Sequence, residues 1–213
     1  MRIVSGSARG RSLLTPPAGE RTIRPTSDRA REALFSILGK AVVRAKVLDL
    51  FAGTGALGLE AYSRGAALVV FIDSETIALD LISRNIARLF AEGQKAGFLQ
   101  LARHDLATRH WQQSVQRLIP SGFDLIFADP PYGQGLSEMV IDHLGDSPLL
   151  AEEGLLVVEE RNTISLPMKT AFLSQIDHRR YGEAGLWFYQ RHRHQATTES
   201  DHPPHAPMTG PPP

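Results

Sequence analysis

The 213-residue sequence contains no cysteine, only 7% aromatic residues, and equal numbers of basic and acidic residues. The lack of cysteine excludes a disulfide framework and thiolate chemistry. No apolar run approaches the length of a membrane span, and the first six residues lack the apolar stretch of a signal peptide. These absences predict a soluble, cytoplasmic protein that does not associate with a membrane.

The charges are unevenly distributed along the chain. Residues 1–31 hold seven arginines and two acidic residues, a net charge of +5, which leaves −5 for the remainder. A basic segment on an acidic body favours a polyanion as the partner. A solvated, charged segment without any partner would give the same pattern.

The length suits one domain with additional segments. We predict a basic N-terminal extension over residues 1–40, made of a β-hairpin and a helix, and a main domain over residues 41–193. Residues 194–213 are polar and rich in proline and histidine, so we expect a disordered tail. The histidines in and beside this tail are irregularly spaced and lack an acidic shell, so we predict no metal site.

The clearest local pattern is the run VLDLFAGTGALG at residues 47–58, an apolar segment that breaks into small residues and then resumes. It predicts a strand, a glycine turn and a helix, the opening unit of a doubly wound α/β sheet. Gly53 and Gly55 allow the backbone to turn sharply and to approach a ligand, toward which the helix N-terminus points free N–H groups. The spacing Gly53-x-Gly55-x-x-Gly58 also matches the dinucleotide fingerprint, so the glycines alone do not identify the ligand.

Asp49 distinguishes between two ligands for this turn, a dinucleotide and S-adenosylmethionine. Its carboxylate would repel a pyrophosphate, but would attract the ammonium and sulfonium groups of S-adenosylmethionine. Asp73 ends the second buried strand, 24 positions further on, where an acidic residue binds ribose hydroxyls. Asp105 follows the third strand and can accept a hydrogen bond from the adenine amino group. The predicted cofactor-binding residues are Asp49, Phe51, Gly53, Thr54, Gly55, Asp73, Ser74 and Asp105.

A second motif, Asp129-Pro130-Pro131-Tyr132, follows the fourth predicted strand. Consecutive prolines immobilise the backbone and leave carbonyl acceptors without N–H donors. With the Asp129 carboxylate they can accept the protons of an exocyclic amino group, while the tyrosine ring stacks on the base. We therefore predict Asp129, Pro130 and Tyr132 as catalytic residues. Four aspartates thus fall at or near the carboxyl ends of successive predicted strands, where open α/β sheets bind ligands: Asp49, Asp73, Asp105 and Asp129.

Several arginines near the N-terminus are candidates for contact with the phosphates of a nucleic acid. Arg9 and Arg11 lie at the glycine-flanked tip of the predicted hairpin, and Arg24 precedes a helix that begins after Thr26 or Ser27. Ordinary surface charge is the simpler alternative. The predicted RNA-binding residues are Arg9, Arg11, Arg24, Arg29 and Arg31.

With these motifs, the chain resembles the ribosomal small-subunit methyltransferase D family over roughly residues 1–191. The resemblance is carried by four segments: residues 9–11 (RGR), 24–29 (RPTSDR), 49–61 (DLFAGTGALGLEA) and 129–132 (DPPY). It implies a class I, Rossmann-like methyltransferase sheet with a small N-terminal hairpin and helix extension. It also implies methyl transfer from S-adenosylmethionine, with S-adenosylhomocysteine as product, to guanine N2 of 16S rRNA in an assembling or assembled small subunit. We expect a monomer. Asp73 replaces the glutamate that is more usual in the family.

Three alternatives fit parts of the pattern. An adenine-N6 methyltransferase acting on DNA would use the same tetrapeptide, because that motif suits any exocyclic amine. A nicotinamide-dependent oxidoreductase would use the glycine turn, although Asp49 argues against it. A non-catalytic RNA-binding module would keep the fold, although the complete aspartate series argues against decay.

Overall fold

The computed structural model describes residues 1–16, 28–90, 98–145 and 147–191, and the side chains of Asp28 and Arg29 lie outside this description. The predicted tail, Arg24 and the predicted helix cap at Thr26 or Ser27 fall outside the described residues. Within the described part of the chain, no helix has the length and apolar character needed to cross a membrane.

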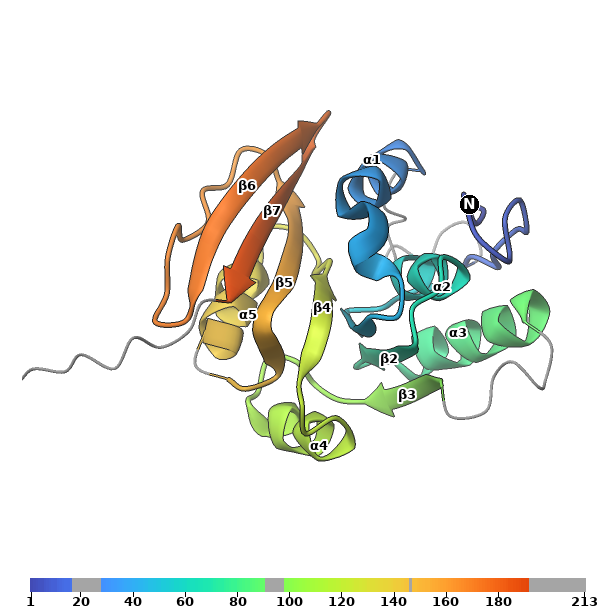
Figure 1. Cartoon of the computed structure of the whole chain (residues 1–213), viewed down its shortest axis with the longest axis horizontal. Coiled ribbons are helices and arrows are strands. Elements are labelled where there is room, and N and C mark those ends of the chain that lie inside the picture. Colours follow the sequence, from blue (N-terminus) through green and yellow to red (C-terminus); the bar gives the residue numbers. More distant parts are fainter. Residues whose placement is uncertain (17–27, 91–97, 146, 192–213) are drawn as a thin grey trace, which may run out of the picture.

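Seven strands form a single mixed sheet in the order β3-β2-β1-β4-β5-β7-β6 (Figure 1). Strands β1 to β5 are parallel, and β7 pairs antiparallel with both β5 and β6. The strand order reverses between β1 and β4, and a crevice for a ligand is expected at such a reversal. The strands are β1 Lys46–Leu50, β2 Leu68–Asp73, β3 Leu99–Arg103, β4 Phe123–Ala128, β5 Leu150–Arg161, β6 Leu173–Tyr181 and β7 Ala184–Arg191.

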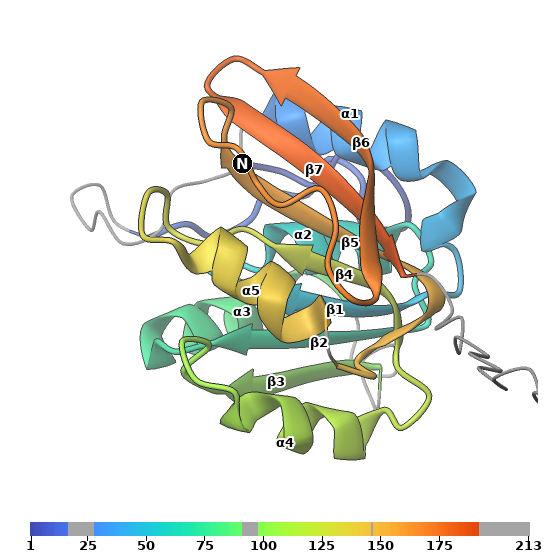
Figure 2. The ribbon, with the colours of Figure 1, turned by 90° about the vertical axis from the view of Figure 1, so that its left-hand side faces the viewer.

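Helices cover both faces of the sheet (Figures 1 and 2). On one face α1, α2 and α3 share a core with Val47, Phe71 and Phe127, and on the other α4 and α5 pack with Leu48 and Ile126. Neighbouring strand residues thus point to opposite faces, which gives the continuous apolar runs of a strand buried on both sides. The helices are α1 Asp28–Leu38, α2 Ala56–Ser63, α3 Thr76–Leu89, α4 His110–Leu118 and α5 Leu136–Gly145, with a 3-10 turn η1 at Gly39–Val42.

The predicted fold class is confirmed, with two differences in the elements. Helix α5 is not predicted from the sequence, because the buried polar side chains of Ser137 and His143 interrupt the apolar pattern. The sequence also predicts a closing pair of strands over residues 171–176 and 186–189. The hairpin is longer, because β6 and β7 pair from Leu173 and Arg191 up to a tight turn at Gly182 and Glu183.

The N-terminal segment, residues 1–16, is less regular than the predicted two-stranded hairpin. Arg2 and Ser12 form an isolated antiparallel bridge, and the Ile3 N–H donates to the Arg11 carbonyl at 2.9 Å. Ile3, Ala8 and Leu13 are buried in the same core as α1, α2 and α3. The segment therefore derives its conformation largely from the helices on which it packs.

Glu60 fastens this segment to α2. Its carboxylate accepts hydrogen bonds from the N–H groups of Val4, at 2.7 Å, and Ser5, at 3.0 Å, and pairs with Arg64 at 2.7 Å. The side chain of Glu60 is completely buried. A buried carboxylate is tolerated only where donors surround it, so the segment and Arg64 supply the partners that Glu60 requires.

We predict that Glu60→Ala lowers the free energy of unfolding by about 2–4 kcal/mol, because the Val4 and Ser5 N–H groups and Arg64 lose their acceptor. Urea unfolding measures this change, and limited proteolysis reports release of the N-terminal segment. The control is Glu32→Ala, an exposed glutamate on α1, which should change the free energy by no more than about 0.5 kcal/mol. Equal effects of the two substitutions would contradict this role of Glu60.

Candidate active site

The glycine turn lies between β1 and α2 with the left-handed backbone that it requires. Phe51 has a φ of +56°, Gly53 of +52° and Gly55 of +76°, and Gly55 is the N-cap of α2. Gly58 lies against β2, where an added Cβ would come within 2.3 Å of the Phe71 ring. The turn and the helix start are thus pressed close to the sheet.

Asp49 lies beneath this turn. Its side chain is 2% exposed, and one carboxylate oxygen accepts the Gly58 N–H at 2.9 Å. Burial raises the pKa of the Asp49 carboxyl well above its usual value; the Gly58 hydrogen bond partly offsets this rise, and the charges of Asp129 and Asp73 add to it. Three carboxyl groups from three neighbouring strands therefore share one electrostatic environment.

Asp73 is tied to the same turn. One oxygen of its half-buried carboxylate accepts the Gly53 N–H at 2.9 Å, and the other accepts the Glu75 N–H at 3.0 Å. Ser74 is exposed next to it, and its carbonyl accepts a hydrogen bond from Arg103. The end of β2 and the glycine turn thus form one hydrogen-bonded unit.

Asp105 and Thr54 differ in exposure. Asp105 is exposed after β3, two strands away from β1, and accepts the Ala107 N–H at 2.9 Å. Thr54 is buried, and its carbonyl accepts a hydrogen bond from Asn85 at 3.0 Å. Asn85 is completely buried on α3 and also exchanges two hydrogen bonds with the backbone of Leu14. Asn85, which is not among the predicted residues, thus joins the N-terminal segment to the glycine turn.

The Asp129-Pro130-Pro131-Tyr132 motif follows β4, the strand that pairs with β1 at the reversal of strand order. Pro130 is buried, whereas Asp129 and Tyr132 are partly exposed. The Tyr132 hydroxyl donates to a carboxylate oxygen of Glu159 at 2.9 Å. Burial raises the pKa of the Tyr132 phenol far above its usual value, and the charges of Glu159 and Asp129 raise it further. Tyr132 is therefore a protonated donor throughout the physiological pH range.

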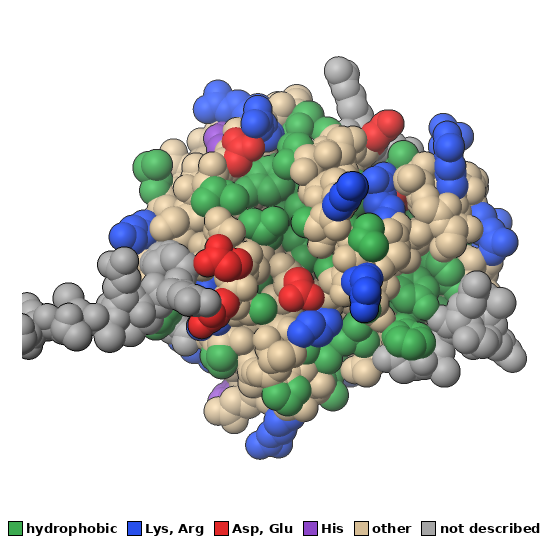
Figure 3. All heavy atoms as spheres, viewed as in Figure 1, with side chains coloured by type: hydrophobic (Ala, Val, Ile, Leu, Met, Phe, Trp, Pro, Cys, Tyr) green, Lys and Arg blue, Asp and Glu red, His purple; other side chains and the backbone are tan. Residues whose placement is uncertain are grey.

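The three predicted RNA-binding arginines whose side chains the structure describes, Arg9, Arg11 and Arg31, differ in exposure. Arg9 and Arg11 are exposed, and the Arg11 guanidinium donates to the Leu89 carbonyl at 2.6 Å. Arg31 is completely buried and donates to the Arg2 carbonyl at 2.5 Å. The burial of Arg31 argues against its predicted contact with RNA phosphates, because the guanidinium is used to hold the N-terminal segment against α1. Figure 3 shows basic side chains spread over the part of the surface that the N-terminal segment and α1 to α3 occupy in Figure 1.

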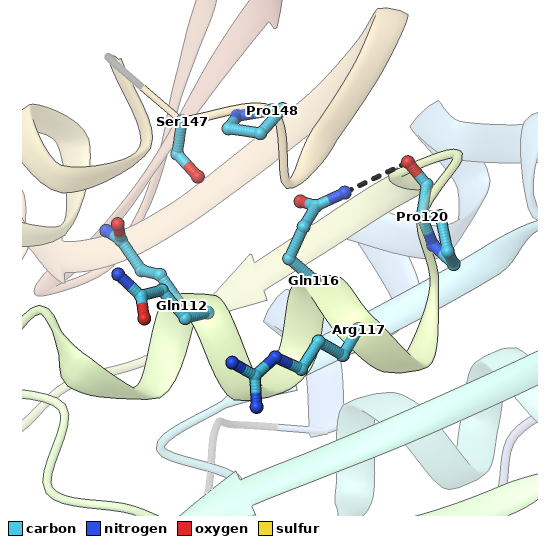
Figure 4. A pocket seen from close by; sticks show the side chains of 7 residues that line it. Gln112, Gln116, Arg117, Pro120, Ser147 and Pro148 are labelled. Atoms are coloured by element: carbon cyan, nitrogen blue, oxygen red, sulfur yellow. Dashed lines mark hydrogen bonds between the residues drawn. The ribbon is translucent and has the colours of Figure 1, made fainter.

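A hollow of about 520 Å³ lies between α4 and the connection that leads from α5 into β5 (Figure 4). Pro120 precedes β4 and Pro148 precedes β5, which places the hollow toward the amino ends of the strands, away from the glycine turn. It contains none of the predicted site residues. The lining residues are Gln112, Gln113, Gln116, Arg117, Pro120, Ser147 and Pro148.

The carboxyl edge of β1, β2 and β4 suits a ligand that carries positive charge. The charges of Asp73 and Asp129 make ionisation of the Asp49 carboxyl more costly, and a cationic group among them would relieve that repulsion. The glycine turn beside them supplies close backbone approach. An anionic pyrophosphate would instead increase the repulsion.

Comparison with known proteins agrees with this chemistry. A family model described as "Conserved hypothetical protein 95" matches residues 1–190. The ribosomal RNA small subunit methyltransferase D of Escherichia coli K12 is 36% identical over 201 residues, which covers 94% of this chain and 93% of that protein. The chain belongs to the ribosomal small-subunit methyltransferase D family. It is an S-adenosylmethionine-dependent methyltransferase, which removes the oxidoreductase alternative.

Solved structures extend the family assignment. The structure of yhhF from Escherichia coli has a TM-score of 0.71 and is 35% identical, covering 90% of this chain and 98% of that one. A more distant structure, determined in complex with SAH, has a TM-score of 0.56 at 14% identity and covers 73% of this chain and 48% of that one, so it shows the fold alone. The predicted class I methyltransferase fold is confirmed, and S-adenosylmethionine is the cofactor.

We predict that Asp49→Asn stabilises the ligand-free protein and weakens cofactor binding. The asparagine oxygen still accepts the Gly58 N–H, but the buried charge is gone. Because the pKa of the Asp49 carboxyl is raised in the folded state, the wild type loses stability as the pH rises through that pKa. The variant should therefore be more stable near neutral pH, by about 1 kcal/mol or roughly 2–4 °C in Tm.

Thermal unfolding across pH tests the first effect, since the gain should vanish as the pH falls and the wild-type carboxyl becomes neutral. Calorimetry with S-adenosylmethionine tests the second, with at least about tenfold weaker binding expected. A variant that binds the cofactor as tightly as the wild type would show that the Asp49 charge is not used for binding.

Proposed function

We propose that this protein transfers a methyl group from S-adenosylmethionine to the exocyclic N2 of a guanine in 16S rRNA of the small ribosomal subunit. The observation that carries the proposal is the position of Asp129-Pro130-Pro131-Tyr132 directly after β4, beside the glycine turn. The name of the Escherichia coli relative supports ribosomal RNA as the acceptor. The protein acts as a monomer in this proposal, with residues 1–40 as the RNA-binding extension and 41–193 as the catalytic domain.

Asp129, Pro130 and Tyr132 act on the target base. The lone pair of guanine N2 is delocalised into the ring, which makes this nitrogen a weak nucleophile. The Asp129 carboxylate and the Pro130 carbonyl accept hydrogen bonds from its two N–H groups and so favour the pyramidal form, with the lone pair directed outward. The proton that N2 loses on methylation passes to the Asp129 carboxylate. The Tyr132 ring stacks on the base, a contact worth about 1–3 kcal/mol. Most of the rate acceleration comes from alignment of the nitrogen lone pair with the methyl group. Such orientation can lower the activation barrier by about 7–11 kcal/mol.

The cofactor is held at the edge formed by β1, β2 and β3. When bound, S-adenosylmethionine supplies an electrophilic methyl group. Asp73 binds the ribose hydroxyls with the lone pairs that the Gly53 and Glu75 N–H groups leave available. Asp105 accepts a hydrogen bond from the adenine amino group. The negative charge of Asp49 favours binding of the cationic ligand. Phe51, Gly53, Thr54, Gly55 and Ser74 complete the proposed cofactor site.

The target nucleotide must leave its stack for its amino group to reach a site at the edge of the sheet. Phosphate contacts then hold the surrounding RNA. Arg9 and Arg11 supply them from the exposed side of the N-terminal segment, and Arg24 and Arg29 are proposed on sequence grounds alone. Arg31 is not part of this proposal because its side chain is buried.

The test of the proposed reaction is methyl transfer from radiolabelled S-adenosylmethionine to unmethylated small subunits, naked 16S rRNA and DNA, with the modified nucleoside identified by mass spectrometry. We expect N2-methylguanosine in the small subunit. Label on adenine would overturn the target but keep the chemistry, and no label despite cofactor binding would favour the non-catalytic module.

Asp129→Ala should lower kcat by about 100-fold or more while cofactor affinity remains near the wild-type value.

We predict that Arg9→Ala weakens binding of the RNA acceptor and reduces the slope of log affinity against log salt by about 1, as expected for a lost phosphate contact. Filter binding at several salt concentrations measures both quantities. Arg117→Ala, an exposed arginine on α4 toward the amino edge of the sheet, is the matched control and should leave the slope unchanged. An unchanged slope for Arg9→Ala would remove Arg9 from the RNA-binding surface.

A further inference from the structure

The ring of Tyr132 is held from two directions by the end of β5. Its hydroxyl donates to the Glu159 carboxylate at 2.9 Å, and the guanidinium carbon of Arg161 lies over the ring, 5.9 Å from its centroid. Glu159 and Arg161 are two residues apart on a strand, so their side chains project from the same face of the sheet. One short segment thus fixes both the far end and one face of the ring.

Glu159 is an unusual residue for its position. It lies in β5, between β4 and β7 in the sheet, and its side chain is only 5% exposed. Placing a carboxylate there is costly unless donors surround it, and the Tyr132 hydroxyl is one such donor. A charged group kept at this cost beside the proposed site suggests a functional role.

The neighbouring glutamate has different partners. Glu160 is 1% exposed and accepts the Ser137 hydroxyl of α5 at 2.9 Å and the Arg161 N–H at 2.8 Å. Its contacts secure the start of α5 and the end of β5. Glu159 and Glu160 are therefore two buried carboxylates of similar exposure. Glu159 is the one that accepts the hydrogen bond from the Tyr132 hydroxyl.

We propose that Glu159 is a positioning residue for the target base: it fixes the plane of the Tyr132 ring, with Arg161 on one face, so that the base stacks on the other face. This inference rests on the function proposed above and adds a residue to it. A hydrogen bond to a carboxylate is stronger and more directional than one to a neutral acceptor, so it fixes the position of the hydroxyl. Because a phenolic O–H lies in the plane of its ring, the position of the Glu159 acceptor also favours one ring plane. A ring already held in the stacking orientation loses less conformational entropy when the base binds.

The experiment compares Glu159→Leu, Glu159→Gln and Tyr132→Phe with the double variant Tyr132→Phe/Glu159→Leu, using the acceptor that the wild-type enzyme methylates. Glu159→Leu removes the acceptor and should lower kcat/KM by roughly tenfold or more, chiefly through a higher KM for the nucleic acid. Glu159→Gln keeps an oxygen for the hydroxyl and should stay within about threefold of the wild type. Tyr132→Phe keeps the ring but loses the hydroxyl, and should resemble Glu159→Leu.

The double variant supplies the decisive comparison. If Glu159 acts through the Tyr132 hydroxyl, Glu159→Leu causes no further loss in the Tyr132→Phe background. Additive losses, a Glu159→Gln variant as impaired as Glu159→Leu, or wild-type kcat/KM in Tyr132→Phe would each overturn the proposal. If Glu159→Leu does not fold, Tyr132→Phe and Glu159→Gln still test the proposal, because wild-type kcat/KM in Tyr132→Phe or a loss of about tenfold in Glu159→Gln would overturn it.

Glu160→Leu is the control for loss of a buried carboxylate. It should lower Tm to a similar extent as Glu159→Leu, while the folded enzyme keeps a KM for the nucleic acid near the wild-type value. Calorimetry should give wild-type affinity for S-adenosylmethionine in all variants. Because every variant is compared on an acceptor chosen by wild-type activity, an error in the proposed target appears in the wild-type reaction, separately from the effect of Glu159.

Discussion

The Asp49 carboxylate accepts the Gly58 N–H at the base of the glycine turn, and the site is arranged around this hydrogen bond. It places a buried negative charge under the first turn of α2, where helix N–H groups can stabilise it. The charges of Asp73 and Asp129 lie close enough to raise the pKa of the Asp49 carboxyl. The ligand-free protein thus holds mutually repelling carboxyl groups along one edge, a cost that the positive charge of the cofactor would offset in the proposed binding site.

The two faces of α2 connect this edge to the rest of the molecule. Gly58 allows the helix to lie against Phe71 of β2, and Glu60, two residues further on and on the other side of the helix, binds the N-terminal segment. Asn85 of α3 completes the connection by bonding both Leu14 and Thr54. The segment that carries Arg9 and Arg11 is therefore part of the same packed unit as the glycine turn.

The fold and the location of the site could be predicted from local patterns. The apolar strands, the glycine turn and the aspartates after successive strands are short-range signals, and the strand order turns them into one edge. Side-chain partnerships between distant residues could not be predicted. Arg31 and Glu60 are charged residues of the kind that usually lies on the surface. Both are buried because the N-terminal segment packs over them.

The same limit explains the residues that the sequence analysis omits near the proposed site. Glu159 comes from a strand whose pattern indicates only a buried apolar run, and its bond to Tyr132 spans 27 positions. A charged residue within an otherwise apolar strand or helix is the signal that could have found both Glu159 and Glu60. Arg9, Asp105 and the other predicted site residues remain predictions about binding, although their positions are now defined.

The antiparallel direction of β7 has a practical consequence for protein engineering. β5 ends at the carboxyl edge, so β7 begins there and carries the chain over eight residues, about 26 Å, to Arg191 at the opposite edge. Met1, in contrast, lies against the glycine turn, where its sulfur accepts the Thr54 hydroxyl at 3.8 Å. An affinity tag or fluorescent fusion attached ahead of Met1 would therefore crowd the glycine turn. One attached beyond Arg191 would start on the far side of the sheet.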